Sequence, residues 1–162
     1  MIGSDRLRRP PARLTTPQPV PVPFTGERAA EKPMTLGQLN ILEWFRSAPE
    51  HPYVTIGAEL AVPGDVRVED VVETLAALLA RHEGLRTRYR NGDPPTQQVL
   101  DSGVLMLGVC SIDGDGSDRS GIAQRLLRQL RAEPLDPAGL PLRVAVAEDT
   151  GTVVAAAMDV SH

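Results

Sequence analysis

The chain has 162 residues, which is enough for one domain with a hydrophobic core. Hydrophobic residues make up 41% of it and charged residues 23%, as in ordinary soluble globular proteins, and only 3% are aromatic, so leucine, valine, isoleucine and alanine must build the core. The net charge of -4 argues against a nucleic-acid-binding surface, and no run approaches the roughly 20 apolar residues that a membrane-spanning helix needs.

Prolines crowd the start of the chain: seven of the 15 lie within the first 33 residues. Proline fixes φ and has no backbone N–H, so this segment is excluded from helices and central strands. Two interpretations fit the alternation of proline with apolar residues in Pro19–Phe24: a disordered leader, or an extended segment along a groove or sheet edge. We therefore expect an extended arm, residues 1–32, followed by a folded unit, residues 33–162.

A helix is expected to begin at Thr35, because Thr35 and Gln38 have the spacing of a capping box. Apolar residues then recur at helical spacing and predict a well-buried helix: Leu39, Ile41, Leu42, Trp44 and Phe45. In Tyr53–Val62 every second residue is apolar, which predicts a half-buried strand with its apolar side toward the core.

The next helix is predicted from about Val68 to His82, where valines and leucines form a broad apolar stripe. His82 follows this stripe by one turn, so a hydrogen-bonded histidine in the core is expected. Gly84 suits the left-handed residue just after a helix, and a strand is predicted over Leu85–Tyr89. Three charged residues near the helix end are expected to form ion pairs: Arg81, Glu83 and Arg86.

Two further short strands are predicted over Thr96–Leu100 and Val104–Val109. Cys110 follows in an apolar run and is expected to be a buried small residue. As the only cysteine it excludes an intramolecular disulfide, which fits a cytoplasmic protein. The polar loop Asp113–Asp118 does not lead to the glutamate that an EF-hand carries at its twelfth position, so no metal site is expected.

A third helix is expected over Ser120–Ala132, with Arg125, Arg128 and Arg131 on its solvent side. Leu142–Glu148 and Thr152–Val160 are then predicted to be strands joined by a hairpin turn. Helices thus alternate with mostly antiparallel strands, which predicts an α/β (α+β) two-layer sandwich with about three helices and a mixed sheet. A histidine after the last strand, His162, is placed where a substrate would meet a strand end.

Several segments, in this order, resemble motifs of the condensation domains of nonribosomal peptide synthetases. Residues 35–38, Thr-Leu-Gly-Gln, stand where that family begins its first motif, Ser-x-Ala-Gln. Residues 81–87 match Arg-His-Glu-x-Leu-Arg-Thr at every fixed position, with Tyr89 in place of the usual phenylalanine. Residues 134–143 resemble Phe-Asp-Leu-x-x-Gly-Pro-Leu-Leu-Arg, and Ser161-His162 falls where His-His-x-x-x-Asp-Gly opens.

The resemblance covers about residues 33–162 and the first half of such a domain. It implies the N-terminal lobe of a chloramphenicol acetyltransferase-like fold, whose active-site histidine lies at the floor of a tunnel between two lobes. His162 aligns with the second histidine of the motif, the one assigned to catalysis, and Ser161 replaces the first. The remaining motif residues are carried over as structural: Gln38, Arg81, His82, Glu83, Arg86 and Arg143.

The resemblance implies amide formation between an acyl thioester and an amine, both tethered to carrier proteins by phosphopantetheine arms, with no cofactor bound directly. Whether His162 acts as a base or positions the amine stays open. A hydroxyl acceptor fits equally well, as in ester-forming acyltransferases of the same fold. The alternative from another class is a noncatalytic module that docks carrier proteins or tailoring enzymes, which Ser161 and the proline-rich arm favour.

The sequence ends inside the last motif, before its aspartate and glycine. We therefore expect these 162 residues alone to be inactive and to expose an apolar face. The partners expected for that face are the second lobe, a companion chain that carries it, or another copy of this chain.

Overall fold

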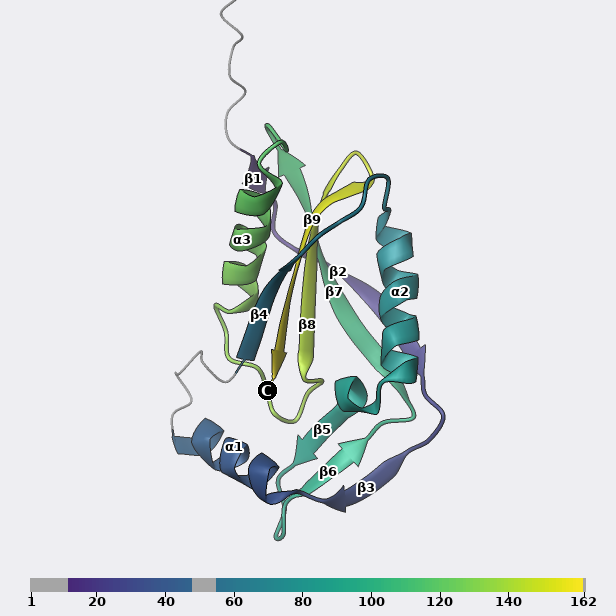
Figure 1. The fold of residues 1–162 in the computed structure, drawn as a ribbon, viewed down its shortest axis with the longest axis vertical. Helices are drawn as coiled ribbons and strands as arrows, with labels where there is room; N and C mark the ends of the chain where they lie inside the picture. Colours follow the sequence, from purple (N-terminus) through teal and green to yellow (C-terminus); the bar gives the residue numbers. More distant parts are fainter. Residues whose placement is uncertain (1–11, 48–54, 162) are drawn as a thin grey trace, which may run out of the picture.

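The computed structural model describes residues 12–47 and 55–161 (Figure 1). The helices and strands in these ranges are β1 (Arg13–Leu14), β2 (Gln18–Thr25), β3 (Ala30–Pro33), α1 (Leu36–Ser47), β4 (Thr55–Leu60), α2 (Val68–Arg81), the 3-10 turn η2 (Glu83–Arg86), β5 (Thr87–Arg90), β6 (Thr96–Val99), β7 (Ser102–Asp113), α3 (Arg119–Leu130), β8 (Leu142–Asp149) and β9 (Thr152–Ser161). Within the same ranges no helix is long and apolar enough to cross a membrane.

Six strands form the main sheet, in which β1, β7, β8, β9 and β4 follow one another and β2 also pairs with β7. β7 and β8 run parallel, and the other pairs are antiparallel. α2 and α3 stand on opposite sides of this sheet (Figure 1). The mixed, mostly antiparallel sheet with three helices that the sequence predicts is confirmed. The order of the elements does not indicate which face each helix takes.

The side chains of β8 alternate between two hydrophobic clusters, one on each face of the sheet. Val144 and Val146 join the cluster that contains the buried leucines of α2. Ala145 and Ala147 join the cluster formed with Ile122 and its neighbours on α3. The small alanine side chains let α3 lie close to the strands, which positions the end of this helix over β9.

The proline-rich segment forms an edge strand of the main sheet. β2 pairs with β7 along its whole length, from Gln18 opposite Val109 to Thr25 opposite Ser102. Val22 and Phe24 point into the core, and the prolines occupy the alternate positions. Because proline has no N–H to donate, the outer edge of β2 is a poor template for a further strand. Of the two interpretations of this segment, the structure places residues 18–25 at a sheet edge.

α1 lies with the three-stranded sheet β3-β6-β5 at one end of the molecule (Figure 1). Leu42 is buried, but Leu36 is 76% exposed and Trp44 is 44% exposed. The expectation of a well-buried helix is therefore wrong. Hydrogen bonds from Gln38 to Gln97 and from Arg46 to Asn91 attach α1 to the small sheet and to the turn after β5.

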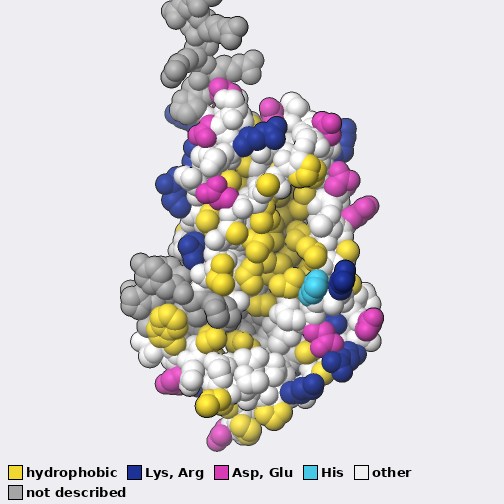
Figure 2. All heavy atoms as spheres, in the orientation of Figure 1, with side chains coloured by type: hydrophobic (Ala, Val, Ile, Leu, Met, Phe, Trp, Pro, Cys, Tyr) yellow, Lys and Arg dark blue, Asp and Glu magenta, His cyan; other side chains and the backbone are white. Residues whose placement is uncertain are grey.

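An apolar strip of the main sheet stays open on the side that carries α2. The pairing of β4 with β9 places Ile56 beside Val160 and Leu60 beside Ala156. α2 covers β2 instead of β4, so Ile56 is 56% exposed although the alternation of this strand predicts a buried apolar side. Figure 2 shows hydrophobic side chains as a band down the middle of this face.

Candidate functional site

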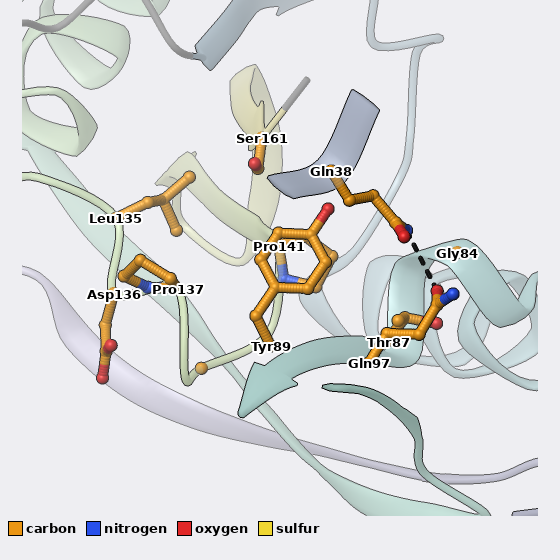
Figure 3. Close-up of a pocket in the computed structure, with 11 residues that line it drawn as sticks. Gln38, Gly84, Thr87, Tyr89, Gln97, Leu135, Asp136, Pro137, Pro141 and Ser161 are labelled. Carbon is orange, nitrogen blue, oxygen red and sulfur yellow. Dashed lines mark hydrogen bonds between the residues drawn. The ribbon is translucent and has the colours of Figure 1, made fainter. Parts of the chain in front are cut away.

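A cavity of about 230 Å³ lies at the end of β9, between the small sheet and the loop before β8 (Figure 3). Its wall draws on each of the segments that resemble a condensation-domain motif: the start of α1, residues 84–89, residues 135–141 and the end of β9. The lining residues are Gln38, Gly84, Thr87, Tyr89, Gln97, Leu135, Asp136, Pro137, Gly139, Pro141 and Ser161. Segments far apart in the sequence thus meet at one site.

Gln38 connects the cap of α1 to the wall of this cavity. Its Oε1 accepts the Thr35 N–H at 2.8 Å, and its own N–H donates to Thr35 Oγ1 at 3.3 Å, so the predicted capping box is present. Its Nε2 donates to Gln97 Oε1 on β6 at 3.0 Å. One side chain therefore caps the start of the helix and attaches the helix to the small sheet.

Tyr89 stands on β5, where its N–H donates to the Pro137 carbonyl at 2.9 Å. This bond joins the small sheet to the loop that precedes β8. Burial raises the pKa of the Tyr89 hydroxyl, and a hydrogen bond from Gln38 partly opposes that rise. The phenol is therefore neutral at ordinary pH and serves as a hydrogen-bond donor or acceptor.

The end of β9 is held on both sides. Ser161 pairs with Thr55 of β4, and its N–H donates to the Pro141 carbonyl at 2.8 Å. Ser161 is half-buried and lines the cavity. His162 and His51 lie outside the described residues, so the role assigned to His162 remains a prediction. The strand that carries His162 at its end is nonetheless fixed up to the preceding residue.

A fully buried carboxylate, Asp159, lies two residues before Ser161. Its Oδ2 accepts Arg143 Nη2 at 2.9 Å, and Arg131 Nε lies 3.3 Å from its Oδ1. Both arginines also donate to backbone carbonyls, Arg143 to Glu133 and Arg131 to Thr55, each at 2.8 Å. Through these contacts, Asp159 and the two arginines connect α3, β4 and β8 to β9, the strand that ends at the cavity.

Sequence reasoning assigned no role to Asp159 and placed Arg131 on the solvent side of its helix, which is wrong. The side chain of Arg131 is 34% exposed and reaches the buried carboxylate across β4. A signal for the acid was present, because Asp159 is the one charged residue in the otherwise apolar run 153–160. The helical periodicity around Arg131 gave no indication that this residue contacts a buried acid.

Arg86 is buried and binds the proline-rich arm. Its Nη1 donates to the carbonyls of Leu100 and of Arg28, the latter at 3.0 Å. Glu83 lies 3.8 Å from Arg86 and accepts two hydrogen bonds from Arg28, at 2.7 and 3.1 Å. The Arg28 guanidinium holds the pKa of Glu83 below its usual range. The ion pairs expected near the end of α2 thus centre on Glu83, and Arg28 is a partner that the motif did not indicate.

Two expectations about this turn are wrong. His82 is exposed instead of buried, because α2 ends at Arg81 and the chain turns to an extended conformation at His82, which takes it off the apolar stripe. Gly84 is part of the 3-10 turn η2 and has no left-handed φ. Arg81 is exposed, and no ion pair of it is found among the described residues.

No protein-family model matches the chain. Two curated relatives are synthetases. Phosphinothricin tripeptide synthetase PhsC of Streptomyces viridochromogenes is 30% identical to this chain over 142 residues. The probable non-canonical nonribosomal peptide synthetase CymA of Salinispora arenicola is 36% identical over 103 residues. The alignments cover 85% and 61% of this chain but only 13% and 1% of those proteins.

A solved structure, the starter condensation domain of rhizomide synthetase RzmA, has a similar fold. The TM-score is 0.68 at 14% identity, and the match covers 82% of this chain and 34% of that one. The likeness therefore concerns the fold, and the chain spans about a third of the solved protein. In its fold and in the order of its motifs, the chain resembles the N-terminal half of a nonribosomal peptide synthetase condensation domain.

Proposed function

We propose that this chain is the N-terminal lobe of a condensation-type acyltransferase, which forms an amide bond between a carrier-tethered acyl thioester and a carrier-tethered amine. The observation that carries the proposal is the cavity beside Ser161, where all the motif segments meet at the end of β9. The next residue along the chain is His162. In the motif, this residue is the site histidine of the complete domain.

In the proposed reaction the amine nitrogen attacks the thioester carbonyl, loses a proton, and the thiolate leaves as a thiol. A neutral imidazole at His162 either accepts that proton or holds the ammonium group in place, and its ordinary pKa of about 6.5 suits both roles. Orientation of two tethered reactants supplies a further part of the rate. The phosphopantetheine arms belong to the substrates, so the chain itself needs no cofactor.

The partners that go with this function are carrier proteins and a second lobe that closes the site. Relatives named as tripeptide and nonribosomal peptide synthetases support carrier-bound substrates. The open apolar strip beside β4 supports a second lobe or companion chain. A cytoplasmic location is part of the proposal, and the single, buried Cys110 is compatible with it.

The proposal is tested by condensation between two carrier-bound substrates, catalysed by the complete protein that carries this chain. His162→Ala should lower the rate by roughly 100-fold or more, the typical contribution of a general acid–base group. His82→Ala is the matched control, because His82 is exposed and does not line the cavity. Equal rates for wild type and His162→Ala would show that the proposed role is wrong.

The noncatalytic docking module remains the second candidate, and Ser161 is the observation that favours it, because it stands where the motif has its first histidine. Such a module would bind carrier proteins with the same affinity before and after His162→Ala and would form no product. An ester-forming enzyme would form product only with a hydroxyl acceptor. Parallel assays with amine and hydroxyl acceptors separate the three functions.

A further inference from the structure

Tyr89 places a phenolic hydroxyl in the wall of the cavity at the end of β9, the only one among the described residues. The strand pairing with Gln97 and the bond from the Tyr89 N–H to the Pro137 carbonyl fix its backbone on both sides. Figure 3 shows the ring standing in the cavity, with its hydroxyl toward Gln38 and Ser161. Condensation domains usually carry phenylalanine at this position of the motif, so the fold itself does not require the hydroxyl.

The two glutamines beside Tyr89 are already held by other partners. Gln38 accepts the Thr35 N–H and donates to Gln97 Oε1 at 3.0 Å. Gln97 Nε2 in turn donates to the Pro33 carbonyl at 3.2 Å. These bonds fix the orientation of both carboxamides. A hydrogen bond from Gln38 to the Tyr89 hydroxyl lowers the pKa of the phenol, as a donor to its oxygen does. A phenol oxygen that accepts this bond keeps its own proton free to donate into the cavity.

We propose that the Tyr89 hydroxyl donates a hydrogen bond to a carbonyl oxygen of the carrier-bound substrate, an inference that rests on the proposed function. The acyl thioester and the amides of a pantetheine arm both offer such an oxygen. Leu135, Pro137 and Pro141 give the same cavity apolar walls for the carbon atoms on either side of it. The volume of about 230 Å³ is below the ~300–1,000 Å³ of sites for drug-sized ligands, so it suits one amide or thioester segment.

The test measures the binding of two small probes to the complete protein by calorimetry. Pantetheine carries the amide carbonyls without a thioester, and S-ethyl thioacetate carries a thioester without an amide. Tyr89→Phe removes the hydroxyl alone and should weaken the binding of one probe by roughly tenfold. Weaker binding of pantetheine to Tyr89→Phe would show that the hydroxyl binds the pantetheine arm. Weaker binding of S-ethyl thioacetate would show that it binds the acyl thioester.

Thr74→Val is the matched control, because it deletes a hydroxyl that bonds the Asp70 carbonyl on the exposed side of α2. It should bind both probes like the wild type. The inference is overturned if Tyr89→Phe binds both probes as tightly as the wild type, or if the wild type binds neither. A failure of the proposed function can be told apart from a failure of this inference. In that case His162→Ala would catalyse condensation at the wild-type rate, whatever the binding of the two probes.

Discussion

Arg143 and Asp159 are directly opposite each other on β8 and β9, and Arg143 Nη2 donates to Asp159 Oδ2 at 2.9 Å. The carboxylate is fully buried, and Arg131 approaches its other oxygen from the end of α3. A buried charge costs folding free energy unless it is paired, so removal of one partner leaves an uncompensated charge inside the protein. This pair therefore holds the strand end that leads to Ser161.

Replacing the acid should destabilise the protein strongly. Asp159→Ala leaves Arg143 and Arg131 without their shared partner, and the expected loss is about 3–5 kcal/mol in the free energy of unfolding. Denaturant unfolding followed by circular dichroism measures it. Glu73→Ala, which removes an exposed carboxylate from α2, should change stability by less than about 0.5 kcal/mol. Equal midpoints for the two variants would contradict the role given to Asp159.

Gly57 has no side chain, so Leu127 and Arg131 at the end of α3 can lie close to β4. A Cβ at Gly57 would lie 2.7 Å from Leu127 Cδ1 and 3.3 Å from the Arg131 guanidinium. Gly57→Ala should therefore cost about 1 kcal/mol, the lower end of the overpacking range, because the atoms that the Cβ meets are the ends of flexible side chains and can shift. At Gly37 of α1 a Cβ meets nothing within 4 Å. Gly37→Ala should instead stabilise by about 0.5–1 kcal/mol, because alanine favours the helix.

The titration of Tyr89 should depart from that of an ordinary tyrosine. Burial raises the folded-state pKa above the usual 10.0, so the native protein holds the phenolic proton more tightly than the unfolded chain does. The resulting stability is fully present below the unfolded pKa and is lost as the pH rises through the folded pKa. The phenolate absorbance of wild type minus that of Tyr89→Phe should show a midpoint above 10.0. A midpoint at or below that value would contradict the partly buried position of the hydroxyl.

The apolar strip on β4 should promote self-association when no partner covers it. Ile56 and Leu60 are 56% and 37% exposed on this strand. Ile56→Ser with Leu60→Ser should shift the protein toward monomer in sedimentation velocity, because less apolar area is available for contact. Met106→Ser, at a 51% exposed position that points away from the core, is the control. If the double variant has the same sedimentation-coefficient distribution as the wild type, the strip on β4 is not the surface through which the protein associates.

Local signals predicted the three helices. The Thr35–Gln38 spacing identified the cap of α1, and the apolar stripe identified α2 within one residue at its end. These predictions succeed because the interactions involved lie within a few residues of one another. Cys110 is fully buried, as its apolar neighbours predict, and burial raises the pKa of its thiol.

Partners that are distant in the sequence could not be predicted in this way. The burial of α1 and of β4 depends on which face α2 covers, and neither spacing nor alternation contains that information. Arg28 and Glu83 are 55 residues apart in the sequence, and Arg131 meets Asp159 only because α3 packs across β4 and β9. The motif resemblance assigned Gln38, Tyr89 and Ser161 to segments of one lobe, and the structure shows that all three line one cavity.

The most direct measurement is the single-turnover rate of amide formation by the complete protein, with both substrates loaded on their carrier proteins. We predict product with the wild type and with His82→Ala, and a rate lower by roughly 100-fold or more with His162→Ala. Product formation by His162→Ala at the wild-type rate would contradict the central claim that the residue after β9 is the catalytic group.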